Sequence, residues 1–110
     1  MTRICWTWLE EMDIFAVAAE GHAGDAVVCS AISALLQTLH RGLLHCCGEK
    51  VAQEQGDALF SLSGCGTREP IRTLFHSIVL GLEEIAAAYP ESVEIFGVGD
   101  KGRSVRLRCE

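Results

Sequence analysis

The chain has 110 residues, which corresponds to a single domain spanning residues 1–110 with one hydrophobic core. Its formal net charge of −6 argues against nucleic-acid binding through the overall electrostatic field and suits a basic partner better. The hydrophobic fraction of 49% and the mean hydropathy of +0.25 are high for a chain this short, so part of the apolar surface is expected in a subunit interface.

The chain begins with alternating side chains. Residues 4–9 show a period of two, which predicts a β-strand, and residues 14–19 read as a second strand. Polar residues between the two segments complete a plausible hairpin. Trp6 and Trp8 share one face of the first strand, which indicates a place in the core or in a dimer interface.

From residue 26 to residue 47 the apolar residues recur at three- and four-residue spacing, which is typical of a helix with one apolar face. Asp25 is expected to cap this helix at its N-terminus, and Gly48 is expected to end it. The run is not expected to span a membrane, because polar residues interrupt it: Gln37, His40, Arg41 and His45. No signal peptide is recognisable, so a cytoplasmic location is expected.

The middle of the chain predicts a second hairpin, in which residues 50–55 and 58–63 flank the turn sequence Gln55-Gly56-Asp57. Residues 63–66 are rich in glycine and are expected to form a loop. Thr67 is then the expected N-cap of a second helix.

This second helix is expected to end at Tyr89-Pro90, and a fifth strand is expected over residues 93–98. A sixth strand is conceivable over residues 101–109. The predicted fold is therefore α/β of the α+β kind, in the order ββαββαβ, with two helices packed in a second layer on a largely antiparallel sheet.

The last ten positions carry four of the nine basic residues: Lys101, Arg103, Arg106 and Arg108. One interpretation is that these charges protect an exposed edge strand against mispairing. The other is that they contact RNA or an acidic partner.

The six cysteines are expected to be reduced and mostly small core residues. No C-x-x-C spacing occurs, so a zinc site is not favoured, and the sequence implies neither a metal nor an organic cofactor. His45-Cys46-Cys47 is interpreted as solvated or core residues rather than as a metal site.

His22 and Cys29 are separated by six residues that include Gly24 and Asp25. A thiol is a nucleophile as thiolate, and an imidazolium or a helix N-terminus favours that form. If Asp25 caps the helix, Cys29 lies near its first turn, and a tight turn at Gly24 would fold His22 back toward the sulfur. Amides of this first turn could bind an oxyanion. The alternative is a half-buried structural cysteine and a histidine at a strand end.

Two short segments carry a family resemblance: Gly21-His22-Ala23, and residues 27–33 with the sequence VVCSAIS. Together they resemble the Prp family of ribosomal-processing cysteine proteases, whose pattern is G-H-A, a loop, and then G-x-D-I-V-C-A-A-V-S at the start of a helix. The element order over residues 2–96 also resembles that family.

The resemblance implies a small dimeric α/β protein that removes an N-terminal extension from a bacterial large-subunit ribosomal protein. Cys29 would be the nucleophile and His22 the general base. Gly21, Ala23 and Ser30 belong to the matching motif and would support the site. Ser33 matches the family's serine and would line the site or bond locally, or else bond back to a helix carbonyl.

The sequence departs from the family pattern at two points. The connection between His22 and Cys29 is shorter than the family's usual loop, which is thought to gate the substrate groove. The family's aspartate falls on Ala26, while Asp25 lies one position earlier and would have to take over any orienting or capping role.

The favoured hypothesis is a cysteine endopeptidase acting on the extension of a basic ribosomal protein. The alternative is a non-catalytic, ribosome-associated dimer that uses the same groove for binding alone. A thiol-based redox protein is disfavoured, since no resolving cysteine lies near Cys29 in sequence.

Overall fold

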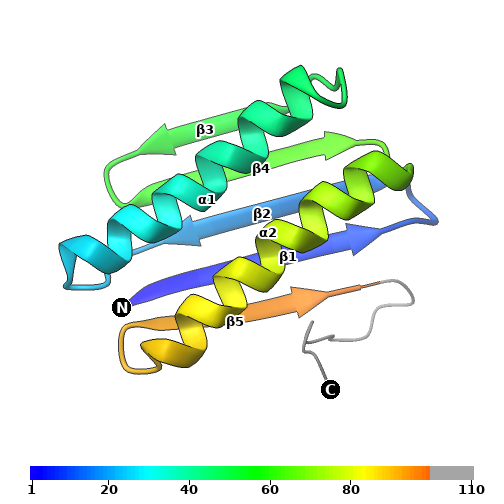
Figure 1. Cartoon of the computed structure of the whole chain (residues 1–110). Coiled ribbons are helices and arrows are strands. Elements are labelled where there is room, and N and C mark those ends of the chain that lie inside the picture. Colours follow the sequence, from blue (N-terminus) through cyan, green and yellow to red (C-terminus); the bar gives the residue numbers. More distant parts are fainter. Residues whose placement is uncertain (100–110) are drawn as a thin grey trace.

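The structure is a computed structural model and describes residues 1–99. Its elements follow the predicted order ββαββαβ (Figure 1). Their bounds are β1 Thr2–Leu9, β2 Ile14–Glu20, α1 Ala26–His45, β3 Ala52–Gly56, β4 Leu59–Cys65, α2 Glu69–Ala88 and β5 Val93–Val98. The conceivable sixth strand and the basic C-terminal residues lie outside the described part of the chain.

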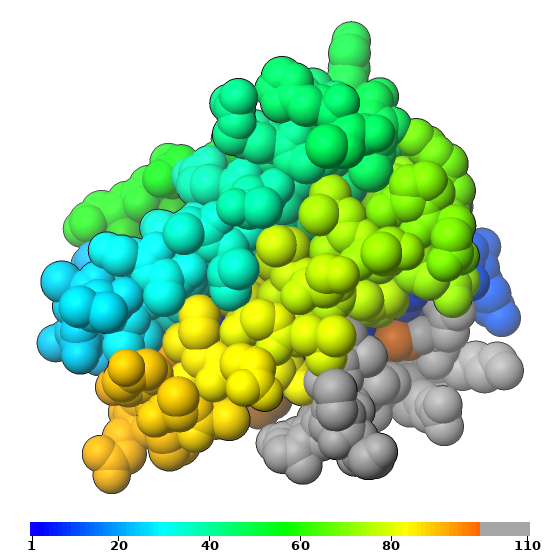
Figure 2. Space-filling view, viewed as in Figure 1, coloured from blue at the N-terminus to red at the C-terminus, as the bar shows by residue number. Residues whose placement is uncertain are grey.

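The five strands form one sheet in the order β3-β4-β2-β1-β5. Three neighbouring pairs are antiparallel, as predicted, and β5 lies parallel to β1. A parallel pair needs a crossover connection, which α2 supplies. Both helices therefore lie on the same face of the sheet, and their side chains fill that face of the molecule (Figures 1 and 2).

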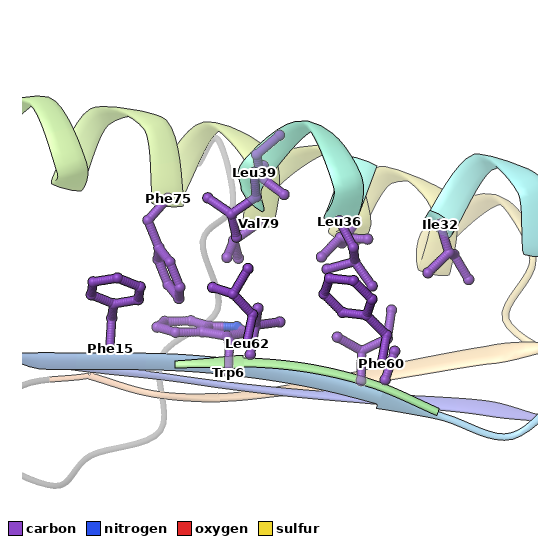
Figure 3. Close-up of a cluster of buried hydrophobic side chains, with 14 of the residues drawn as sticks. Trp6, Phe15, Ile32, Leu36, Leu39, Phe60, Leu62, Phe75 and Val79 are labelled. Atoms are coloured by element: carbon purple, nitrogen blue, oxygen red, sulfur yellow. The ribbon is translucent and has the colours of Figure 1, made fainter. Parts of the chain in front are cut away.

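The core lies between the helices and the sheet (Figure 3). Strands β1 and β2 contribute every second residue to it, β4 contributes Phe60 and Leu62, and α1 and α2 contribute stripes at helical spacing. Both tryptophans of β1 are buried there: Trp8 lies 5.2 Å from Phe75 and 6.1 Å from Phe15 between ring centroids. Within this chain, Trp6 and Trp8 are thus core residues.

Helix α1 begins where the sequence predicts. The Val27 N–H donates to Asp25 Oδ1 at 2.8 Å, which is the N-cap geometry. The helix ends at His45, two residues earlier than predicted, and Cys46 is its C-cap. Gly48 then adopts a φ of +68°, which glycine tolerates best and which turns the chain away from the helix.

By length and mean hydropathy (1.3), α1 also meets the criteria for a membrane-spanning helix. One such helix is weak support for a membrane span, because the core helix of a globular protein meets the same criteria. Here the apolar stripe of α1 packs in the core through Val28, Ile32, Leu36, Leu39 and Leu43.

The prediction of a glycine-rich loop over residues 63–66 is wrong, because β4 continues through Cys65. Gly64 is needed for close packing rather than for a turn: a Cβ at this position would lie 2.8 Å from Cζ of Phe15. Only Gly66, with a φ of +123°, leaves the strand.

Thr67 is not the N-cap of α2. The cap is Arg68, which makes no capping hydrogen bond through its side chain. The Thr67 N–H and hydroxyl both donate to Asp13 Oδ1, each at 2.8 Å, so Thr67 joins the β1–β2 turn to the start of α2.

His76 of α2 should make the fold sensitive to acid. Its ring packs between Trp6 and Trp8, with centroid distances of 6.0 and 5.0 Å. Burial lowers the pKa of His76 below 6.5, the Arg72 charge adds to this, and Glu10 opposes it. The unfolded chain therefore binds the proton more readily, so the stabilisation is fully present above pH 6.5 and is lost as the pH falls through the folded pKa.

Urea unfolding at pH 7.5 and pH 5 measures this effect. We expect the free energy of unfolding to fall at the lower pH, and to fall less in His76→Phe, which keeps an aromatic ring between the tryptophans. An equal fall in both proteins would contradict the assignment to His76.

Candidate active site

The site begins at the corner between β2 and α1. Gly21 adopts a φ of +90°, and a Cβ there would lie 2.3 Å from the Met1 carbonyl oxygen. The Thr2 hydroxyl donates to the Gly21 carbonyl at 3.2 Å, and Gly24 has a φ of +82°. Glycine is therefore required at position 21, and β1 holds the corner in place.

Cys29 is the fourth residue of α1 and is half-buried. Its Sγ accepts a hydrogen bond from the Ala23 N–H at 3.4 Å. The corner at Gly24 thus brings the residue next to His22 into contact with the sulfur. The approach of the His22 imidazole itself to the sulfur stays a prediction.

One pocket of about 180 Å³ adjoins this corner. His22, Cys29 and Ser33 all line it, together with residues of β2, α1 and the β3–β4 hairpin. Part of its wall is apolar, through Ile32, Leu36 and Phe60. The structure therefore places the predicted nucleophile, base and serine around one cavity.

The other predicted site residues surround this pocket in different ways. Gly21 lines it, and Ala23 is buried behind it against Cys29. Asp25 is engaged in the helix cap, and Ser30 is exposed on α1 and is not among the lining residues. Within residues 1–99 the Ser33 hydroxyl makes no hydrogen bond to a helix carbonyl, whereas Thr38 and Ser77 do.

The expected oxyanion donors at the helix N-terminus are partly occupied. The Cys29 N–H donates to the Asp25 carbonyl at 3.0 Å, and the Val27 N–H donates to the Asp25 carboxylate. The Ala23 N–H, by contrast, points at the Cys29 sulfur.

His22 has a partner that the sequence does not indicate. Its side chain is 65% exposed, and Nε2 lies 3.7 Å from Oδ1 of Asp57. Asp57 belongs to the turn between β3 and β4, which lies one residue later than predicted because Gly56 still belongs to β3. The turn sequence itself is visible, but nothing in it links residue 57 to residue 22.

Among residues 1–99, no group of three or more His, Cys, Asp or Glu side chains is arranged to hold a metal ion. Cys29 and the other cysteines in this range are free thiols. A free thiol and an imidazole line one pocket at the start of a helix, and these are the groups that a cysteine-dependent hydrolase uses.

The family model described as cysteine protease Prp matches residues 1–94. The chain therefore belongs to the Prp family of cysteine proteases, which agrees with the resemblance of the motif around His22 and Cys29. No curated protein matches the chain significantly by sequence.

Solved structures confirm the fold. The chain is similar to the ribosomal processing protease Prp from S. aureus in complex with a covalently linked product peptide, with a TM-score of 0.76 and 21% identity over 92% of this chain and 100% of that one. The structure of the same protease in complex with a substrate peptide matches with a TM-score of 0.74 and 17% identity, over 88% of this chain and 99% of that one. The structure of SMU.848 from Streptococcus mutans matches with a TM-score of 0.73 and 21% identity, over 90% of this chain and 95% of that one.

Proposed function

We propose that this chain is a cytoplasmic cysteine endopeptidase that removes the N-terminal extension of a large-subunit ribosomal protein. The observation that carries the proposal is the shared pocket of His22, Cys29 and Ser33, in which the Ala23 N–H is bonded to the Cys29 sulfur. Membership of the Prp family supplies the reaction class.

In the proposed mechanism, His22 takes the proton of the Cys29 thiol, and the thiolate attacks the scissile carbonyl carbon. The tetrahedral intermediate collapses as His22 donates that proton to the leaving amine, which leaves a thioester on Cys29. His22 then accepts a proton from water, whose oxygen attacks the thioester carbonyl carbon. The C–S bond breaks, the cleaved extension leaves with a new C-terminal carboxylate, and the Cys29 sulfur takes the proton back from His22. The Ala23 N–H donates to the Cys29 Sγ and would therefore be near the carbon that this sulfur attacks, so it is the oxyanion donor we assign.

The chemistry of the pocket and of the chain supports a basic, extended substrate. The apolar side chains of Ile32, Leu36 and Phe60 would accept an apolar side chain next to the scissile bond. The net charge of −6 would attract a basic ribosomal protein at long range. A homodimer belongs to the proposal, since Phe96 and Val98 of β5 expose 55% and 37% of their surface.

The alternative function is a non-catalytic, ribosome-associated dimer that binds the same segment. It is favoured by one observation: within residues 1–99, no hydrogen bond joins His22 to the Cys29 thiol.

Intact-mass analysis of the extended ribosomal protein from the same organism separates the two functions. We expect incubation with this protein to give a single N-terminal truncation, and no truncation with protein that has first been alkylated with iodoacetamide. An uncut ribosomal protein that still co-elutes with this chain would overturn the proposal in favour of the binding function.

A further inference from the structure

The catalytic imidazole needs an orienting partner, and the corner that carries His22 does not supply one. The Asp25 carboxylate accepts the Val27 N–H at 2.8 Å and is thereby held in the helix cap. Position 26 is alanine and has no carboxylate. Within residues 1–99, the one ion pair of His22 is with Asp57.

Asp57 reaches His22 from a different part of the chain. It occupies the β3–β4 turn, which lies at the same end of the molecule as the start of α1 (Figure 1). Strands β2 and β4 pair up to Glu20 and Leu59, and the Gly21 N–H then donates to the Ala58 carbonyl at 2.9 Å.

This backbone hydrogen bond holds the backbone segments that carry the two side chains next to each other. It joins the residue before His22 to the residue after Asp57. Gly21 and Ala58 both adopt positive φ, +90° and +59°, so each turn holds a specific backbone conformation at the junction. The sheet therefore places the backbones of His22 and Asp57 near each other, and their side chains approach to 3.7 Å from there.

We propose that Asp57 is the positioning residue for His22, an inference that rests on the proposed peptidase function. Its carboxylate accepts the proton on Nε2, which leaves Nδ1 as the nitrogen that exchanges a proton with Cys29. It also stabilises the imidazolium that forms when the thiol ionises. The present 3.7 Å is longer than a hydrogen bond, and bound substrate that excludes water draws the pair together.

Both side chains are largely exposed, at 65% for His22 and 99% for Asp57, so the effect in the resting protein is modest. An exposed pair of this kind changes an equilibrium by about two- to five-fold. The effect on peptide cleavage is larger, about ten-fold, because substrate covers the pair.

The experiment measures the rate of Cys29 alkylation by iodoacetamide against pH, with each cysteine resolved by peptide mass spectrometry. For Asp57→Asn we expect alkylation at pH 7 to slow by about two- to five-fold and the profile to move to higher pH. Asp57→Glu should restore most of the rate. Glu54→Gln removes the same charge from an exposed position of β3 outside the pocket and should leave the profile unchanged.

The same substitution in a His22→Gln background tests whether Asp57 acts through the imidazole. There, Asp57→Asn should have no further effect. An effect that persists without His22, or one that Glu54→Gln reproduces, would overturn the assignment, since either result means that Asp57 acts through the general field.

No ribosomal protein enters this measurement, so its failure is distinct from failure of the proposed function. If Cys29 is alkylated no faster than the other cysteines, and if its rate is unchanged in His22→Gln, the proposed peptidase function is contradicted. If the alkylation of Cys29 is fast and slows in His22→Gln but not in Asp57→Asn, only the positioning role of Asp57 is contradicted. Urea unfolding of each variant controls for loss of structure.

Discussion

Cys29→Ala is expected to abolish cleavage of the extended ribosomal protein, with a rate loss of at least about 10³-fold. The reason is that no other thiol among residues 1–99 lines the pocket of His22. The substitution removes one sulfur from a half-buried position and leaves the Asp25 cap and the α1 stripe in place. Binding of the ribosomal protein should therefore survive, so the variant should trap the uncut complex.

Cys65→Ala is the matched control, because Cys65 is an exposed free thiol at the end of β4 outside the pocket. It should cleave at the wild-type rate. Product yield over time, followed by intact mass, measures both variants. Residual cleavage by Cys29→Ala above the uncatalysed rate would assign the reaction to another group.

Gly97→Ala is expected to destabilise the fold by about 3 kcal/mol, at the upper end of the usual cost of overpacking. Gly97 of β5 pairs with Trp6 of β1, and a Cβ at this position would lie 1.9 Å from Cε2 of the indole. Trp6 cannot easily move, since it is 2% exposed and packs edge-on against Phe75 with a centroid distance of 6.2 Å. The clash must therefore be relieved by shifting β5 or the core.

Gly56→Ala is the control, because Gly56 is also a strand glycine, but a Cβ added there would have no described atom within 4 Å apart from its chain neighbours. Its stability should change by less than about 1 kcal/mol. Urea unfolding compares the two variants. If the clash with the indole is the cause, Trp6→Leu in the Gly97→Ala background should recover part of the lost stability. Equal urea-unfolding midpoints for wild type and Gly97→Ala would contradict the clash.

The order of elements is predictable from local patterns, because each strand and helix carries its own hydrophobic period. The wrong predictions at Gly64 and Thr67 concern residues that serve a distant contact. Gly64 has the sequence context of a turn residue, but it makes room for the Phe15 ring. Thr67 has the context of a helix cap, but it bonds to Asp13 across 54 positions of sequence. The parallel pairing of β5 with β1 is a long-range contact of the same kind.

The same distinction applies to the site. His22, Cys29 and Asp25 lie within one short segment, so their motif and the helix cap are visible in the sequence. Asp57 reaches His22 only through the pairing of β2 with β4, and the Ala23 N–H contacts Cys29 only once the corner is folded. A backbone N–H donor, or a side chain that comes from another hairpin, leaves no pattern in the sequence around His22 and Cys29 that would predict it.

The way Thr2 is held has a consequence for folding kinetics. Its N–H donates to the Ser92 carbonyl at 2.8 Å, while its hydroxyl donates to the Gly21 carbonyl beside His22. Contacts between β1 and β5 close a loop of about 91 positions, and such closures are slow compared with hairpin formation. The support for Gly21 is therefore completed only when the last strand has docked. A nascent chain whose residues 93–98 are still inside the ribosome would carry His22 and Cys29 without the full support of their corner, so we expect the reactivity of the Cys29 thiol to develop late in synthesis.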